Sequence, residues 1–376
     1  MTELSALFPE TYDASRGRFR KDLAAVQAMW PKAKLFRHAL PGDEDLTIDW
    51  IYSDAGESNE KILMLTTGEH GVECYVGSAM LQRFIEVYMP KIDPRKTGIL
   101  LLHAINPWGM KHHRRGNKDN IDLNRTFIWN GGFDPAFNPD YDKVDAFLNP
   151  PSKLRNLFLS DLAYLFGLAW HHVRMGTSNF RYAHLLGQYR HPKGLYYGGT
   201  ETPEETRTLM ELYRQVLTNY NQVLHLDMHT GYGPRYQMSL VNSALDKHTS
   251  QELANRFNFP LVVAATADEF YALRGDMIDY IYALQQNEFP QKKLYATSFE
   301  FGTLGDKLYG LFHGPRVMIH ENRAYWHGTG NEKIHAQAKH GFEELFNPTA
   351  KDWREKAVAD ADQAFTGILK AQGYIP

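Results

Sequence analysis

The chain has 376 residues, of which 43% are hydrophobic and 23% charged, and its formal net charge is -3. This composition is typical of a soluble globular protein and gives no electrostatic reason to bind nucleic acid or an acidic membrane surface. We expect a single catalytic domain over residues 1–376, because α/β folds of this length often keep one core with insertions.

The N-terminal segment predicts neither a signal peptide nor a transmembrane helix. Met1 to Pro9 carries Glu3 and no cationic stretch that leads into a long apolar run. Cys74 is the only cysteine, so an internal disulfide is excluded, which fits a reducing compartment. We therefore expect a cytoplasmic protein with no membrane partner, and the sequence leaves its oligomeric state open.

Strand-like and helical patterns alternate along the chain. Residues 35–40 and 46–52 flank a turn-forming Pro41-Gly segment and predict an antiparallel hairpin at a sheet edge. Short, continuous apolar runs predict strands buried on both faces, at 61–65, 98–102, 223–226, 260–264 and 294–298. Helical periodicity is present at 15–30, 75–90, 152–172, 203–220, 246–257, 276–286, 331–346 and 350–371. The expected fold is α/β, a three-layer α/β/α sandwich with a mixed central sheet.

One stretch of the chain differs from this alternation. Residues 130–200 are punctuated by glycine and proline, as at Gly131-Gly132 and Pro150-Pro151, and contain many aromatic side chains. We interpret them as an insertion that packs on the core. The helices from Asn331 onward are expected to form a surface layer over the sheet.

Polar residues follow the apolar strand at 61–67. His70 and Glu73 belong to the loop beyond its carboxyl end, where open α/β sheets bind ligands. An HxxE pair alone is commonly only a polar loop or the start of a helix. Gly68 and Gly71 permit a tight backbone around the histidine, which favours a site.

Two further strands also end in ionisable residues. His229 ends the strand at 223–226 and could supply a third ligand, with Asp227 accepting its second N–H or holding loop amides. The alternative is a satisfied buried histidine, of which His225 is an example. Glu300 lies between two phenylalanines, whose burial raises a carboxylate pKa while a nearby cation lowers it, so it suits a general base. A single glutamate at a strand end is more often structural.

The order of these motifs resembles the M14 zinc carboxypeptidase superfamily over about residues 60–302. The motifs are HGVE at His70, RGN at Arg115, DLNR ending at Arg125, DMH ending at His229 and the strand-ending Glu300. Finer features, among them the run Gly68-Glu-His-Gly-Val-Glu73, resemble the branch named DUF2817.

The resemblance implies a role for each matched residue. It makes His70, Glu73 and His229 the ligands of one Zn²⁺ per chain, and Glu300 the general base and proton shuttle. A bound Zn²⁺ would supply a Lewis acid that lowers the pKa of water, and Glu300 would take a proton from the water as it attacks an amide carbonyl.

The remaining matched residues would contact the substrate. Arg115 would polarise the scissile carbonyl, and Asn124 and Arg125 would hold a substrate carboxylate. Val72 stands where digestive carboxypeptidases have an arginine, so extended peptide binding of their kind is not expected. Tyr271 is the candidate for a substrate-capping tyrosine, with Phe270 and Tyr282 as alternatives.

The expected function is zinc-dependent hydrolysis of an amide bond near a free carboxylate, most closely as in a metallocarboxypeptidase. Its partner would be a peptide or an N-acyl amino acid. One alternative is an N-acyl amino-acid deacylase resembling succinylglutamate desuccinylase and aspartoacylase, which usually carry a smaller separate C-terminal domain. Another is a zinc-binding protein that has lost catalysis, although metal retention alone needs neither Arg115 nor Glu300.

Overall fold

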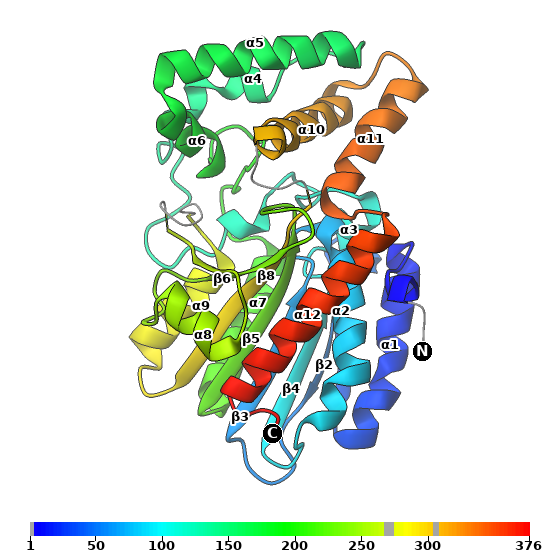
Figure 1. Ribbon diagram of the computed structural model, residues 1–376, viewed down its shortest axis with the longest axis vertical. Helices are drawn as coiled ribbons and strands as arrows, with labels where there is room; N and C mark the ends of the chain where they lie inside the picture. The colour runs from blue at the N-terminus through cyan, green and yellow to red at the C-terminus, as the bar shows by residue number, and fades with distance from the viewer. Residues whose placement is uncertain (1–3, 267–273, 304–307) are drawn as a thin grey trace.

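The computed structural model describes residues 4–266, 274–303 and 308–376. Its centre is a sheet of eight strands in the order β1-β2-β4-β3-β5-β8-β6-β7 (Figure 1). The strands are β1 Lys34–Leu40, β2 Asp43–Ser53, β3 Lys61–Thr67, β4 Thr97–His103, β5 Gln222–Thr230, β6 Met238–Asn242, β7 Val262–Ala264 and β8 Lys293–Phe301.

The four central strands, β4, β3, β5 and β8, are parallel, and antiparallel pairs flank them. The predicted edge hairpin is confirmed, because β1 pairs antiparallel with β2. The mixed α/β sheet is confirmed as well. Strand β6 was not predicted, because polar Ser239 and Asn242 interrupt its apolar pattern although all five of its residues are buried.

Helices pack on both faces of the sheet and complete the three layers. The helices on one face are α1 Tyr12–Met29, α2 Cys74–Val87, α8 Ser250–Phe257 and α12 Lys351–Ala371, and they share one core with the sheet. On the other face, α7 Glu204–Asn219 and α9 Met277–Glu288 share a second core. The shorter helices near the loops are α3 Pro107–His112, η1 Leu4–Leu7, η2 Gly71–Glu73, η3 Met89–Lys91, η4 Leu123–Arg125 and η5 Tyr141–Lys143.

Helix α12 illustrates why the sequence places a helix against the sheet. Trp353, Ala357, Ala361, Ala364 and Ile368 are buried and recur at intervals of three or four residues, which makes one apolar face. The segment therefore gains its stability by packing, as the helical periodicity predicted.

A further group of helices lies beyond one end of the sheet (Figure 1). It comprises α4 Asp145–Leu148, α5 Leu157–Met175 and α6 Thr177–Leu185 from the predicted insertion, together with α10 Leu308–His327 and α11 Glu332–Phe346. These helices share their own hydrophobic cluster, which includes Leu168, Phe180 and Met318. We call this group the helical layer.

The helical layer corrects two expectations. The prediction that the helices after Asn331 cover the sheet holds for α12 but is wrong for α11, which packs chiefly on α10. Helix α10 was not predicted, because Gly314 and Pro315 lie inside it and normally indicate a break. Within the described ranges, no helix is both long and apolar enough to cross a bilayer.

Candidate metal centre

The predicted ligands lie at the carboxyl ends of β3, β5 and β8. In the register of the parallel strands, Thr67 is opposite Met228 and His229 is opposite Glu300. The chain leaves β3 toward β4 on one side, whereas β5 lies on the other side. Open α/β sheets bind ligands at this kind of switch point.

A tight turn positions His70 and Glu73. Gly68 has a φ of +75°, and a Cβ on Gly71 would lie 2.1 Å from the carbonyl carbon of Gly109. The amides of Gly71 and Val72 donate to the carbonyls of Arg115 and Arg114, at 3.1 and 2.9 Å. The turn is thus fixed by the loop that carries Arg115, and only glycine fits at Gly71.

Three side chains converge at this turn. Nδ1 of His70 lies 3.0 Å from Oε1 of Glu73 and 3.3 Å from Nδ1 of His229. Nδ1 of His229 lies 3.3 Å from Oε2 of Glu73. In a tetrahedral zinc site with bonds of about 2.0–2.1 Å, neighbouring ligand atoms are about 3.3 Å apart. The donor set fits such an ion.

Two buried carboxylates hold the outer nitrogens of the histidines. Nε2 of His70 lies 3.0 Å from Oδ1 of Asp122, and Nε2 of His229 contacts Oδ2 of Asp227. Thr66 donates to the other Asp227 oxygen at 2.5 Å. These contacts leave each Nδ1 directed at the centre, as the outer partners of metal-binding histidines do. The sequence suggested this role for Asp227 but not for Asp122.

The charges in this cluster reinforce one another. Burial alone would raise the pKa of Glu73, but His70, His229 and Arg115 hold it well below its usual range. The pKa of Asp122 is likewise held low against the effect of burial, by Arg115, Arg125 and His70. Arg115 joins both carboxylates, at 2.9 Å from Glu73 and 3.2 Å from Asp122. Both carboxylates are therefore anionic.

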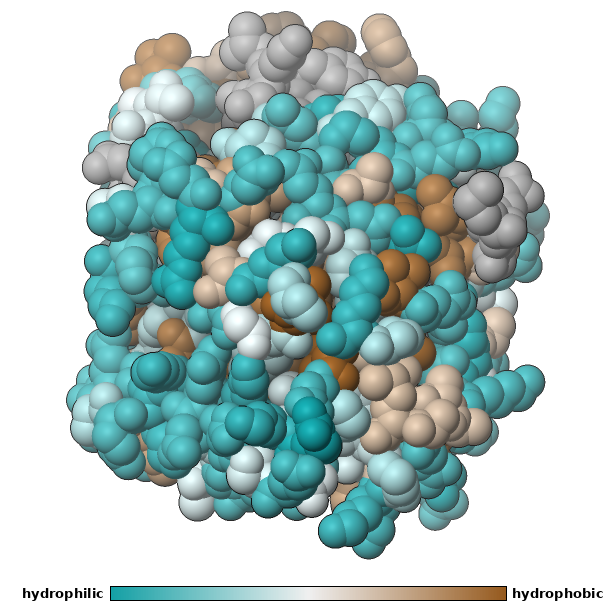
Figure 2. Space-filling view, turned by 60° about the horizontal axis from the view of Figure 1, so that its bottom comes forward, coloured by the Kyte–Doolittle hydropathy of each residue, from teal (hydrophilic) through white to brown (hydrophobic). Residues whose placement is uncertain are grey.

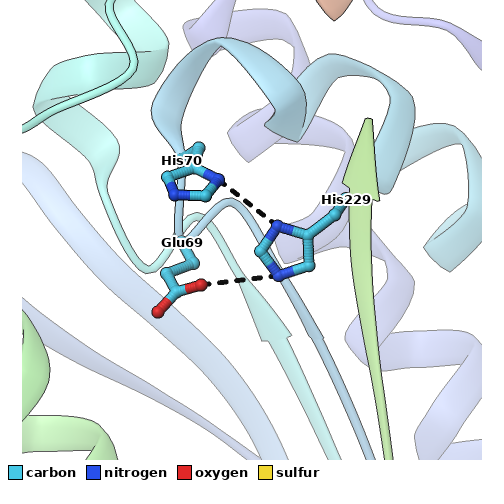
Figure 3. Close-up of side chains that lie close together, drawn as sticks. All are labelled: Glu69, His70 and His229. Carbon is cyan, nitrogen blue, oxygen red and sulfur yellow. Dashed lines mark hydrogen bonds and ion pairs between the residues drawn. The ribbon is translucent and has the colours of Figure 1, made fainter. Parts of the chain in front are cut away.

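Glu69 is a further buried carboxylate near the histidines, and no role was predicted for it from the sequence. Its Oε2 lies 3.4 Å from Nε2 of His229 (Figure 3), and Glu69, His70 and His229 form a group whose ligand atoms lie within 4.8 Å of one another. Neither Glu69 oxygen has a hydrogen-bond partner among the described residues, and burial raises its pKa well above the usual value. Its position inside the Gly68–Glu73 motif is the sequence feature that could have identified Glu69 as a site residue.

Glu300 lies on the strand next to His229. It is 9% exposed and accepts a hydrogen bond from the amide of Tyr232 at 3.0 Å. Burial and the charge of Glu73 raise the pKa of Glu300 to about 7, against the opposing effects of His229, the Tyr232 amide and Arg115. A carboxylate with this pKa can accept and return a proton near neutral pH.

The predicted substrate-binding residues differ in their placement. Arg115 and Asn124 line a cavity, and the side-chain Oδ1 of Asn124 accepts from the amide of Met277 at 3.1 Å. Arg125 is 1% exposed and is not among the described residues of the cavity wall. Its Nη1 and Nη2 donate to the carbonyls of Asn124 and Leu185, at 2.8 and 2.9 Å.

Tyr271, the predicted capping residue, lies outside the described residues, as does its alternative Phe270. The other alternative, Tyr282, is part of the core. Its hydroxyl donates to Asp246 at 2.5 Å and accepts from the amide of Ala296 at 3.2 Å. Tyr282 is therefore a structural residue.

The cavity has a volume of about 880 Å³ and extends from the strand ends into the helical layer. His70, Glu73, His229 and Glu300 lie at its sheet end. The opposite end is formed by α5, α6 and α10, so the insertion contributes directly to the cavity wall.

Comparison with solved structures gave matches at low identity. Carboxypeptidase A from Helicoverpa armigera is 13% identical, with 88% of this chain and 73% of that chain covered and a TM-score of 0.48. Bovine thrombin-activatable fibrinolysis inhibitor is 14% identical, with coverages of 88% and 97% and a TM-score of 0.46. An aspartoacylase family protein from Mesorhizobium loti is 16% identical, with coverages of 78% and 66% and a TM-score of 0.38.

The sequence matches no curated protein. It does match a protein family described as "Protein of unknown function (DUF2817)", over residues 8–360. Since this match spans nearly the whole chain, the protein belongs to the DUF2817 family.

Proposed function

We propose that this protein is a zinc-dependent hydrolase of an amide bond near a free carboxylate, with an activity of the metallocarboxypeptidase kind. The convergence of the side chains of His70, Glu73 and His229 beside Glu300 carries this proposal. This arrangement combines a histidine-rich ligand set with a separate carboxylate that has a raised pKa.

His70, Glu73 and His229 would hold one Zn²⁺. When bound, the ion supplies a Lewis acid that polarises a carbonyl and makes water more acidic. We favour Glu73 over Glu69 as the carboxylate ligand, because Glu73 meets both Nδ1 atoms at 3.0 and 3.3 Å. Glu69 instead meets Nε2 of His229, where Asp227 already makes contact.

Glu300 is the proposed general base. It takes a proton from the attacking water and later returns it to the leaving amine. Its pKa of about 7 allows both steps near neutral pH. Arg115 presents its positive charge to the cavity while it is paired with Glu73 and Asp122, and it would stabilise the negative charge that develops on the carbonyl oxygen.

Asn124 and Arg125 are the proposed binding site for the substrate carboxylate. The ring of Tyr196 lies next to both Arg115 and Arg125, with 5.8 and 5.3 Å between the guanidinium carbon and the ring centroid. Tyr196 and Asn124 line the cavity, so Arg125 lies directly behind that wall. A carboxylate clamp at Arg125 requires its side chain to turn from the Leu185 carbonyl toward the cavity.

Metal analysis of four forms of the protein tests the centre. The unmodified chain should bind one zinc, and His229→Ala should lose most of it. Glu73→Gln and Glu69→Gln form a matched pair, because both replace a buried carboxyl group beside His229 by an amide of the same size. We expect zinc loss only in Glu73→Gln, whereas loss only in Glu69→Gln would transfer the ligand role to Glu69.

Hydrolysis then tests the activity itself. The zinc-loaded protein should hydrolyse at least one member of a panel of peptides and N-acyl amino acids. A protein that binds stoichiometric zinc and hydrolyses none of them would instead be the zinc-binding protein without catalysis.

A further inference from the structure

The two ends of the cavity differ in chemical character. The sheet end is lined by ionisable side chains, as described above, whereas the helical layer contributes mainly apolar ones. Leu165 and Leu168 come from α5, Phe180 from α6, and Phe312 and Met318 from α10. Cavities of roughly 300–1,000 Å³ hold drug-sized ligands, so a volume of about 880 Å³ leaves space well beyond the reacting amide.

Polar side chains also lie within the helical wall, namely Thr177, Arg181 and two histidines, but they are fewer than the apolar ones. Nδ1 of His172 and of His184 lie 2.8 and 3.0 Å from the carbonyls of Leu168 and Phe180, one turn earlier in the same helices. These ring nitrogens are already partnered by the protein. A ligand segment bound there is therefore contacted mostly by carbon.

The chemistry of this wall distinguishes two kinds of ligand. A peptide would bring N–H and C=O groups into the apolar end, and each such group left without a partner is unfavourable there. An alkyl chain brings no polar group and gains from burial. The wall therefore fits an alkyl chain better than a peptide backbone.

The apolar wall also continues onto the surface of the molecule. Leu165 and Phe312 line the cavity and are nevertheless 51% and 38% exposed. Further along α5, Phe158, Phe166 and Trp170 are exposed as well. The face shown in Figure 2, toward the other end of the molecule, is mostly hydrophilic. Exposed apolar surface of this extent commonly marks a ligand or interaction site.

We propose that the substrate is an N-acyl amino acid with a long alkyl chain, and that α5, α6 and α10 bind the chain. This inference rests on the proposed function. Water cleaves the amide C–N bond, and its oxygen goes to the acyl carbon to give a fatty acid. The nitrogen receives a proton and leaves as the free amino acid.

A chain-length series tests the proposal with the zinc-loaded protein. N-acyl derivatives of one amino acid, with 2, 6, 10 and 14 acyl carbons, should show kcat/KM rising by up to about fourfold for each methylene, the equivalent of about 0.8 kcal/mol per buried CH₂. We expect at least about a 100-fold gain from 2 to 10 carbons, until the cavity is filled. A series that is fastest with the acetyl compound would overturn the chain site and leave the hydrolase intact.

Two leucines of α5 give a matched pair of variants. Leu165 lines the cavity and is 51% exposed, whereas Leu159 is 60% exposed and lies outside the described cavity wall. Leu165→Asp should lower the ratio of kcat/KM for the 10-carbon and 2-carbon substrates by about tenfold or more, and Leu159→Asp should not change this ratio. Equal ratios in both variants would contradict the proposal.

Binding of the fatty-acid product gives a readout that needs neither zinc nor turnover. Titration calorimetry with decanoate and metal-free protein should show binding that Leu165→Asp weakens about tenfold and Leu159→Asp leaves unchanged. If no substrate is hydrolysed but decanoate binds in this pattern, the proposed function fails while the chain site stands. If decanoate does not bind, the chain site is wrong.

Discussion

The two walls of the cavity are built in different ways. The wall at the sheet end is built from strand ends, which place His229 beside Glu300, and from the loops that follow them. Its ionisable groups hold one another through contacts such as those of Arg115 with Glu73 and Asp122. The helical wall comes from the insertion and α10, which share a separate apolar cluster. Under the proposed function, the residues at the strand ends would carry out the chemistry, while the helical layer would select the substrate.

The largest expected effect is at the strand ends. Glu300→Gln should lower kcat by about 10²–10⁴-fold, the usual contribution of a general base, while the zinc content stays the same because the ligand set is unchanged. Glu288→Gln is the control, since Glu288 lies on α9 in an exposed ion pair with Arg214. Unchanged turnover of a confirmed substrate by Glu300→Gln would show that Glu300 is not the general base.

The next prediction tests whether the strand-end wall also binds the carboxylate of the substrate. Converting a substrate carboxylate to its amide should lower kcat/KM by about 30-fold to several thousandfold, since leaving one member of a buried charge pair without its partner costs about 2–5 kcal/mol. We expect Arg125→Ala to remove most of this preference without loss of zinc.

Arg181→Ala is the matched variant, because Arg181 lies on α6 and lines the helical wall. If Arg181→Ala removes the preference and Arg125→Ala does not, the helical layer binds the substrate carboxylate. The assignment of carboxylate binding to the strand-end wall would then be wrong. Equal rates for acid and amide in the unmodified protein would reject a clamp at either position and favour a general amidase.

The strand-end wall was accessible to sequence reasoning because its signals are local. Apolar runs marked β3, β5 and β8, and the residue types at their ends identified His70, His229 and Glu300 as candidates. Glycine at Gly68 and Gly71 indicated the tight turn, which the structure confirms through a positive φ and a close backbone approach. The parallel register then brings these short segments together.

The placement of Arg125 could not be derived in this way. Its partners are the carbonyl of Leu185 and the backbone around Gly187, where a Cβ would lie 2.5 Å from the Arg125 Cδ. These contacts join η4 to the end of α6 and the residues just after it, about sixty positions apart, so no local periodicity in the sequence indicates them. The part of the cavity wall formed by α10 was not predicted either, because Pro315 lies inside that helix and normally indicates a break.

The pH dependence of turnover should follow Glu300. Its raised pKa means that the carboxylate loses its charge as the pH falls through about 7, so the base is present above this pH and absent below it. A bound cation adds positive charge and shifts the pKa downward. We expect kcat/KM to fall about tenfold per pH unit on an acid limb at or below pH 7. An acid limb above pH 8, or one retained in Glu300→Gln, would assign the titration to another group.

The smallest expected effect is a change in the free energy of unfolding at the outer surface of the helical layer. It distinguishes apolar side chains that stabilise the fold from those that are only exposed on its surface. Phe166 is 72% exposed on α5, whereas Phe180 is 5% exposed in the cluster that joins α6 to α10. Phe180→Ala should lower the free energy of unfolding by about 3–5 kcal/mol through the cavity it leaves. Phe166→Ala should change it by less than about 0.5 kcal/mol, as at most surface positions. Chemical denaturation of both variants measures the difference.

A loss of more than about 1 kcal/mol in Phe166→Ala would mean that another molecule packs on this face in solution. A midpoint that depends on protein concentration would identify that molecule as a second copy of the chain.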